Sequence, residues 1–197
     1  MRFNKWKIVI AMAVLLAAVF AINWGTQGIT EDSTRFAIRF TARSSCIAFL
    51  LAFVAAPLDR RWHSPTSQWL LQNRRFLGLA MAVSHTYHAI AFTTLQVSIL
   101  HQPLHGDPLA ILGYIFLIAM TITSFSTPTK KIGRKAWRIL HTAGMYYFWL
   151  AFALEFGMRS LREWGYSVLT FLVIAALIIR LLDRRKLPLD AANLPSK

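Results

Sequence analysis

Two histidines, His85 and His88, stand three residues apart in RRFLGLAMAVSHTYHAIAF, a stretch that is otherwise apolar and long enough to cross a bilayer. A third, His141, stands in the apolar stretch WRILHTAGMYYFWLAF. Ionisable side chains at membrane depth are costly and usually functional. Neutral imidazole is a good iron ligand, and histidines on two facing helices can hold a b-type haem. These residues therefore predict haem binding; the alternative is hydrogen bonding across helices or to water.

Depth along the helices bears on which histidine pairs with His141. At about 1.5 Å per residue, His85 lies roughly 15 Å beyond Arg75 and His88 roughly 20 Å. His141 lies only about 5 to 9 Å beyond the basic loop that precedes it. This estimate favours His85 as the partner by about one turn, a margin that helix tilt can remove.

The composition is that of a membrane protein. Of the 197 residues, 56% are hydrophobic, and the mean hydropathy is +0.46, more apolar than a soluble domain. We expect an all-α, six-transmembrane-helix bundle with spans at 8–23, 41–58, 76–100, 109–125, 137–158 and 166–182. Pro57 predicts the end of the second helix. Residues 1–186 are expected to form this one domain, and residues 187–197 a disordered cytoplasmic tail.

The positive charges predict the orientation. The formal net charge is +14, and seventeen of the 22 basic residues flank the expected spans on one side: Arg2, Lys5, Lys7, Arg60, Arg61, Arg74, Arg75, Lys130, Lys131, Arg134, Lys135, Arg138, Arg180, Arg184, Arg185, Lys186 and Lys197. By the positive-inside rule, both termini are cytoplasmic in a bacterial-type inner membrane. The charge is interpreted as a topology signal with affinity for membrane lipid, rather than as a nucleic-acid-binding surface.

Other features restrict the class of function. Residues 1–25 begin like a signal peptide, but the apolar run is long and no A-x-A site follows, which favours a retained helix. Cys46 is the only cysteine, so neither an intramolecular disulfide nor a cysteine cluster is expected. The chain has no nucleotide-binding motif. The predicted electron donor is therefore a quinol or a separate cytoplasmic flavoprotein, which could dock on the loop 130–138.

Four features together are typical of one family. They are the second-helix stretch TARSSCIAFLLAFVAAPLDRR, the R-R-x-L-G-L start of RRFLGLAMAVSHTYH, the W-x-x-L-H end of STPTKKIGRKAWRILH, and the order of six helices. With them the chain resembles the ferric-reductase-like transmembrane domain family, and within it the haem-binding membrane subunit of the periplasmic methionine-sulfoxide reductase system. The resemblance covers nearly the whole chain, with Ala42 where that subunit usually has glycine.

The resemblance implies haem binding and electron transfer. It aligns His88 with the haem-ligating histidine of the family and His141 with a second family histidine. A third family histidine is replaced by Leu154, next to Glu155, so the resemblance implies one haem b per chain. The alignment selects His88 as the partner of His141, and His85 stays the alternative ligand. The methionine-sulfoxide pathway is not transferred, and the acceptor is unassigned.

Further residues are candidates around the haem. Gly78, two turns before the first histidine of its run, and Gly144, three residues after His141, would let a flat macrocycle approach the backbone. Close helix packing by small residues is the alternative. Arg39 and Arg43 could pair with haem propionates or with a quinone, the second candidate cofactor. Snorkelling to lipid phosphates is the alternative for both arginines.

Two other groups have a simpler interpretation. Three loop histidines, two of them near Asp107, could bind a metal ion, but solvated loop histidines are common: His63, His101 and His105. Three aromatic residues after His141 could line a haem pocket, but an aromatic stripe is more often packing: Tyr146, Tyr147 and Trp149.

The sequence thus predicts a haem-binding membrane protein that relays electrons between a separate redox partner protein or quinone and an unknown acceptor. Two alternatives stay open. One is a haem-free transporter or channel in which the histidines relay protons. The other is a membrane scaffold whose histidines only pack.

Overall fold

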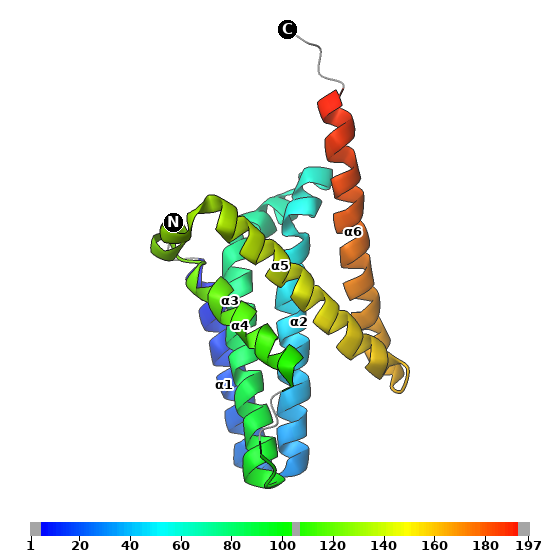
Figure 1. The fold of residues 1–197 in the computed structure, drawn as a ribbon. Coiled ribbons are helices and arrows are strands. Elements are labelled where there is room, and N and C mark those ends of the chain that lie inside the picture. The colour runs from blue at the N-terminus through cyan, green and yellow to red at the C-terminus, as the bar shows by residue number, and fades with distance from the viewer. Residues whose placement is uncertain (1–4, 104–106, 193–197) are drawn as a thin grey trace. The chain divides into compact units, whose positions relative to one another are not determined.

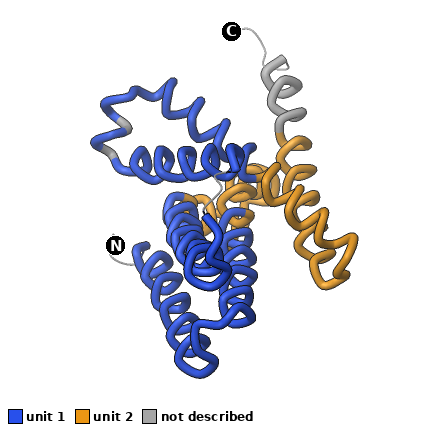
Figure 2. Tube along the Cα trace, turned by 60° about the horizontal axis from the view of Figure 1, so that its bottom comes forward, with its two compact units in different colours: residues 1–49, 75–148 blue, residues 50–74, 149–197 orange. Residues whose placement is uncertain are grey.

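The computed structural model describes residues 5–103 and 107–192, which form helices and their connections without a strand. Figure 1 shows the elements: α1 (Trp6–Gln27), α2 (Glu31–Trp62), α3 (Pro65–Thr93), η1 (Thr94–Ile99), α4 (Pro108–Ile122), α5 (Ser126–Ser160), η2 (Trp164–Tyr166) and α6 (Ser167–Ala192). The chain divides into two compact units, coloured in Figure 2. Unit 1 comprises residues 1–49 and 75–148, and unit 2 comprises residues 50–74 and 149–197.

Helices α2 and α3 begin well before the predicted spans because polar residues cap them. At the start of α2, the Thr30 N–H donates to Ser33 Oγ (3.0 Å), and the Ser33 N–H donates to Thr30 Oγ1 (3.3 Å). Ser64 and Ser67 make the same reciprocal pair before α3, at 2.9 and 3.2 Å, and Pro65 occupies the first helical position. Each pair satisfies N–H groups that have no partner within the helix.

The prediction that Pro57 ends the second helix was wrong, because α2 continues through it to Trp62. Proline has no backbone N–H, so the carbonyl four residues earlier, that of Phe53, loses its helical partner. In unit 2 the Arg180 side chain of α6 replaces that partner: its Nη1 donates to the Phe53 oxygen at 2.8 Å. The guanidinium also lies 4.3 Å from the centroid of the Phe53 ring. A contact from another helix thus satisfies the carbonyl that the proline leaves open.

Helix α6 extends beyond the expected sixth span. Residues 187–192, expected to be disordered, continue α6 as far as Ala192. The last five positions of the expected tail, 193–197, lie outside the described residues.

The core of unit 1 joins α1, the first part of α2, and α3, which lie side by side in Figure 1. Three buried residues, one from each helix, form its centre, with three partly buried neighbours: Phe20, Ala37 and Ala91, then Trp24, Ile38 and Tyr87. Helices α4 and α5 pack closely through small residues. A Cβ on Gly113 of α4 would lie 3.2 Å from the Tyr147 ring of α5.

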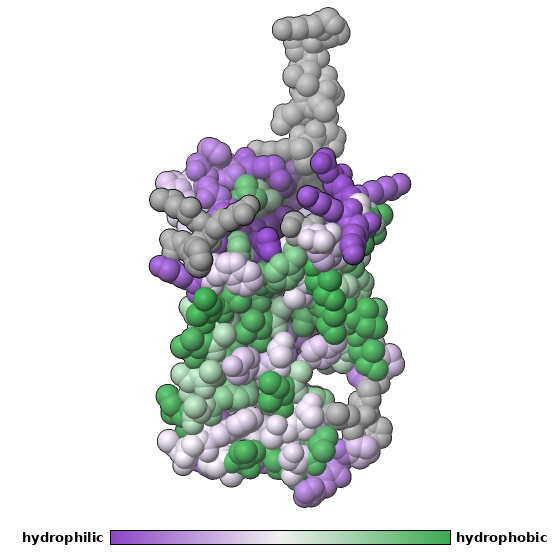
Figure 3. Space-filling model, turned by 90° about the vertical axis from the view of Figure 1, so that its left-hand side faces the viewer, coloured by the Kyte–Doolittle hydropathy of each residue, from purple (hydrophilic) through white to green (hydrophobic). Residues whose placement is uncertain are grey.

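The chain is an all-α membrane protein by the length and polarity of its helices. Within the described part of the chain, three helical segments are long and apolar enough to cross a membrane: Trp6–Gln27, Glu31–Trp62 and Trp164–Asp183. Helix α4 has 15 apolar-rich residues, or about 22 Å, less than the roughly 30 Å hydrocarbon core. Large apolar side chains are exposed on α1 and α4, among them Ile10, Val14, Ile115 and Ile118. Figure 3 shows apolar side chains over the middle of one face and hydrophilic side chains gathered at one end.

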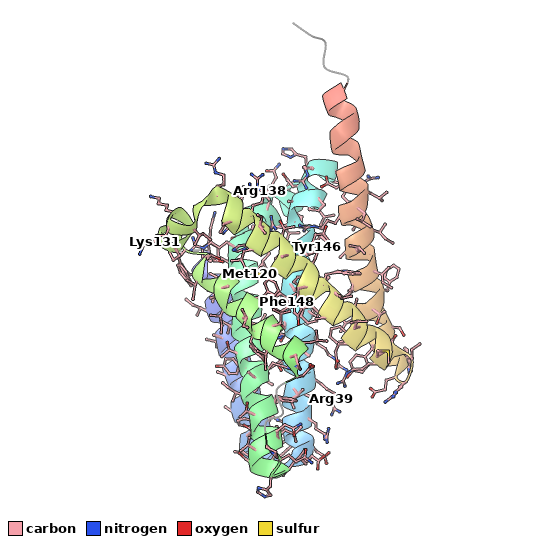
Figure 4. All side chains as sticks on the ribbon, viewed as in Figure 1. Arg39, Met120, Lys131, Arg138, Tyr146 and Phe148 are labelled. Atoms are coloured by element: carbon pink, nitrogen blue, oxygen red, sulfur yellow. The ribbon has the colours of Figure 1, made fainter. Side chains whose placement is uncertain are left out.

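Helix α5 contains a sharp bend at Gly133, where φ is 79°. This left-handed conformation favours glycine because other residues have a Cβ that clashes there. The bend separates a short basic segment, 126–132, from the long helix that carries His141. Figure 4 shows Lys131 and Arg138 at one end of unit 1, away from Arg39 of α2.

Candidate functional site

The two α3 histidines lie next to each other in unit 1. His85 and His88 are both partly buried, and their ring centroids are 5.5 Å apart with an interplanar angle of 30°. Two hydroxyl residues one turn apart on the antiparallel α2 face them. Thr41 contacts His88, and Ser45 contacts His85.

The contacts of His88 determine which of its nitrogens carries the proton. Its Nδ1 lies 3.2 Å from the carbonyl oxygen of Ile38 and 3.1 Å from Thr41 Oγ1. The Thr41 hydroxyl already donates to the carbonyls of Ala37 (2.8 Å) and Ile38 (3.0 Å). Both neighbours of Nδ1 are therefore acceptors, so Nδ1 donates and the basic lone pair of the neutral ring belongs to Nε2. A hydrogen bond of this kind orients a metal-ligating histidine.

His85 faces a different set of neighbours. Its Nδ1 lies 2.8 Å from Ser45 Oγ, a contact in which either group can donate. Its ring is 5.7 Å from the ring of Tyr114 on α4 and 5.9 Å from the ring of Phe148 on α5. His85 thus contacts α4 and α5, whereas the hydrogen bonds of His88 described above are made to α2.

A buried serine joins α2 and α3 beside the histidines. Ser84 Oγ donates to the Thr41 carbonyl at 2.9 Å and lies 2.8 Å from Ser44 Oγ. Both Ser84 and Thr41 are fully buried. These polar contacts between helices set the register in which Thr41 and Ser45 meet the two imidazoles.

His141 has its partners at the end of α4. Its Nε2 lies 3.0 Å from Thr123 Oγ1, and the Thr123 hydroxyl donates to the Ala119 carbonyl at 2.6 Å. The imidazole stacks on the Trp137 ring, with 4.4 Å between centroids, and Trp137 Nε1 donates to the Thr123 carbonyl at 3.0 Å. The W-x-x-L-H motif therefore places its tryptophan and histidine on one face of α5, against the end of α4.

The level of His141 relative to His85 follows from α5. The α5 residue that contacts the His85 ring is Phe148, which lies seven residues beyond His141. Seven residues make about two turns, or roughly 10 Å along the helix. His141 accordingly lies nearer the Lys131 and Arg138 end of α5, visible in Figure 4.

The two candidate glycines have different surroundings. A Cβ on Gly78 would meet no heavy atom within 4 Å, so there is open space beside α3 at this position. A Cβ on Gly144 would lie 2.2 Å from Met120 Sδ and 3.3 Å from the Phe116 ring. Close packing against α4 therefore accounts for Gly144, whereas Gly78 leaves room beside its helix.

The remaining candidates lie apart from the histidines or have other contacts. Arg39 and Arg43 are exposed on α2. Tyr147 packs on Gly113, and its hydroxyl donates to the Leu109 carbonyl. In unit 2, Trp149 Nε1 donates to the Val173 carbonyl at 2.9 Å. Both aromatic residues thus take part in helix packing.

The loop histidines do not form a metal site within the described residues, where no group of three or more potential ligands is found. His101 is exposed, and Asp107 caps α4 by accepting from the Leu109 N–H at 3.0 Å. His105 lies outside the described residues. His63 is exposed, with its Nδ1 3.6 Å from Asp59 Oδ1.

Sequence reasoning missed the hydroxyl partners of the histidines, which are Thr41, Ser45 and Thr123. The sequence did hint at two of these partners, because Thr41 and Ser45 are hydroxyl residues four positions apart in a largely apolar stretch. Their spacing nearly matches that of His85 and His88, as it must when two helices pack side by side. The partner of His141 had no such signal, because only the fold brings Thr123 to it.

The fold and the histidines thus define an all-α membrane protein with imidazoles between its helices that contact hydroxyl groups. Curated relatives agree with the family resemblance. The protein-methionine-sulfoxide reductase haem-binding subunit MsrQ of Cronobacter sakazakii is 26% identical over 160 residues, covering 73% of this chain and 78% of that protein. The MsrQ subunits of Salmonella paratyphi B and Salmonella newport are 29% identical over 151 residues, covering 68% of this chain and 73% of each. No family model and no solved structure matches the chain.

The predicted resemblance to these haem-binding subunits is therefore confirmed. The similarity extends over most of the chain and does not rest on the histidine motifs alone.

Proposed function

We propose that this chain is a multi-pass inner-membrane protein that binds one b-type haem and relays electrons between a separate donor and an acceptor. The observation that carries the proposal is the tautomer of His88, whose Nδ1 donates to Ile38 and Thr41 and whose Nε2 keeps the basic lone pair. The similarity to proteins named as haem-binding subunits supports it.

The residues present fit a haem in two respects. The donor set contains partly buried imidazoles, which are suitable iron ligands, and the open space at Gly78 lies two turns from His85 on nearly the same face of α3. When bound, a haem supplies reversible one-electron transfer at its iron. The proposed ligands are His88 and His141, with His85, whose ring lies 5.9 Å from that of Phe148 on α5, as the alternative to His88. Arg43 stays a proposed propionate partner, whereas Gly144 packs on Met120 and is not proposed to line the haem.

Haem ligation by His141 through Nε2 requires a change in its contacts. That nitrogen donates to Thr123 in the present structure, because the Thr123 hydroxyl proton is used by the Ala119 carbonyl. Ligation would exchange the Thr123 contact for the iron. Trp137, stacked on the imidazole, would then restrict the ring to a rotation in its own plane.

The proposed topology has six crossings with both termini in the cytoplasm. The three long apolar segments support part of this count, and the separation of Lys131 and Arg138 from Arg39 in Figure 4 supports the direction of α5 and α2. The basic segment 130–138 is the proposed docking site for a donor flavoprotein. Quinol is the alternative donor.

Absorption spectra of the purified protein, oxidised and dithionite-reduced, test the proposal. We expect a Soret band and a reduced α-band typical of a b cytochrome. A protein that stays colourless after expression with ample haem would refute haem binding and would leave the transporter and the scaffold as the remaining classes. Proton flux in vesicles would then separate those two.

A further inference from the structure

Three arginines from three helices act on one another in unit 2. Arg60 lies near the end of α2, Arg74 in α3 and Arg180 in α6. The Arg60 Nε lies 2.9 and 3.1 Å from the two carboxylate oxygens of Asp183, and Nη2 contacts Oδ2 as well. Arg180 acts electrostatically on the same Asp183. Arg60 is thus paired with Asp183, while the Arg180 guanidinium donates to the Phe53 carbonyl at 2.8 Å.

Arg74 differs from the other two. It is half-buried, and no hydrogen bond or ion pair to another described residue is found for it. The charges that act on it are those of Arg180 and Arg60, both positive. Burial and these two charges lower the pKa of Arg74. The folded chain thus holds a desolvated cation among like charges, which is unfavourable unless an anion joins it.

The geometry of arginine indicates the kind of anion. Its planar guanidinium donates two parallel N–H groups that match the oxygens of a phosphate group. Two exposed tryptophans in the same unit, Trp62 at 58% and Trp69 at 50% exposure, are typical of the membrane–water interface. Basic pockets between membrane helices at this level bind anionic lipid headgroups.

We propose that Arg74, with Arg60 and Arg180, binds the phosphate group of an anionic phospholipid headgroup at the basic ends of α2, α3 and α6. Asp183 holds Arg60 in place through its bidentate contact. The site is separate from the histidines of unit 1, and it does not depend on haem binding.

Native mass spectrometry of the delipidated protein in a neutral detergent tests this site. We expect one short-chain phosphatidylglycerol to bind saturably. Phosphatidylcholine has the same phosphate but adds a choline ammonium that the three arginines repel, so it should bind about tenfold more weakly or worse. Arg74→Gln should weaken phosphatidylglycerol binding by a similar factor of about ten. Equal binding of the two lipids to the unmodified protein would overturn the proposal.

Arg61→Gln is the matched control, because it removes the same charge from the same end of unit 2. Arg61 is exposed, with its guanidinium 5.3 Å from the Trp62 ring, and the variant should change phosphatidylglycerol affinity by no more than about twofold. General attraction of lipid to a basic surface would instead weaken binding equally in both variants, by about fivefold. That result would overturn a specific site.

Two further measurements complete the test. Arg74→Lys keeps the charge but loses the planar fork, so it should bind phosphatidylglycerol several-fold more weakly than the unmodified protein; this variant decides the question if Arg74→Gln does not fold. Inorganic phosphate in large excess should not displace the lipid. Displacement that depends on Arg74 would identify a free-phosphate site and would refute the lipid assignment.

Discussion

His88 is the histidine whose protonation the surrounding backbone and side chains constrain most. A carbonyl oxygen can only accept, so the contact between Nδ1 and Ile38 requires a proton on Nδ1. His85 has no such constraint, because the Ser45 hydroxyl can donate or accept. Its ring contacts with Tyr114 and Phe148, however, place it on the side of α3 that meets α4 and α5. The two histidines therefore have different claims to the ligand role.

Single substitutions of the three histidines should assign the ligands. His141→Ala should abolish or severely reduce haem binding, since α5 has no second histidine. His88→Ala should remove or strongly perturb the haem, whereas His85→Ala should keep a six-coordinate low-spin spectrum with a modest shift in potential. Optical spectra and redox titration of the purified variants measure this.

The opposite pattern, with haem lost from His85→Ala and kept by His88→Ala, would show that the ring contacts of His85 were the better guide. Unchanged spectra in all three variants would place the ligands elsewhere.

Thr41→Val should weaken haem binding about tenfold or more, the usual effect of removing the hydrogen-bond partner of a ligating histidine. Valine keeps the shape of threonine but removes the Thr41 oxygen that lies 3.1 Å from His88 Nδ1, while the Ile38 carbonyl stays in place. Haem titration into the apoprotein measures the affinity. Ser44→Ala is the control, since Ser44 contacts Ser84 in the same layer and should bind haem normally; equal loss in both variants would indicate a packing defect.

Helix α2 continues past Pro57 because a side chain of another helix supplies the hydrogen bond that the proline cannot make. The carbonyl of Phe53 has no N–H partner four residues on, and the Arg180 guanidinium donates to it at 2.8 Å. A proline in an apolar helix is thus compatible with helix continuity when a donor from outside reaches the exposed acceptor. In this unit the same side chain also acts on Asp183.

A double-mutant cycle tests this hydrogen bond. Arg180→Met should destabilise the protein by about 1 to 3 kcal/mol, the penalty for a buried acceptor without a donor. In a Pro57→Ala background the restored N–H of residue 57 satisfies Phe53, so the same change should cost measurably less. Unfolding by denaturing detergent, with all four proteins in the same lipid-free neutral detergent, gives the free energies. Strict additivity of the two changes would contradict the proposed coupling.

For the whole molecule, the basic residues outside the expected spans predict the orientation in the membrane. A reporter fused after Lys197 should fluoresce as a cytoplasmic protein and show no periplasmic phosphatase activity, because seventeen of the 22 basic residues lie on the side expected to be cytoplasmic. A phosphatase fusion at His101, in the expected outer loop, is the reciprocal control and should be active. Phosphatase activity at Lys197 would refute the even number of crossings.

Haem content is the second property of the whole chain that can be measured directly. We expect pyridine haemochrome analysis to give about one haem per chain, since bis-histidine ligation of a second would need more imidazoles than the expected spans offer. Leu154, where the family has a further histidine, is exposed in unit 2 at 56%. A ratio approaching two would mean that Glu155 or a loop residue supplies a ligand.

Apolar patterning was sufficient to predict the helix content of this chain, and motif spacing was sufficient to predict its relatives. A run of about 20 apolar residues has few options besides a helix in a membrane, so all six runs appear in α1 to α6. The W-x-x-L-H and R-R-x-L-G-L motifs each lie within a single helix, where the spacing of residues in the sequence fixes their relative positions in space. The similarity to haem-binding subunits extends beyond these motifs, over about 70% of the chain.

Contacts between helices required the tertiary structure, because nothing in a linear pattern specifies which faces meet. Three contacts join distant segments: the hydrogen bond of His88 with Thr41, that of His141 with Thr123, and the packing of Gly144 on Met120. Pro57 is the clearest case. Proline by itself predicts a helix end, but α2 continues because Arg180, more than a hundred residues away in the sequence, donates to the Phe53 carbonyl. The local sequence thus determines where each helix forms, whereas the side chains that meet between helices determine which groups the histidines and arginines can bind.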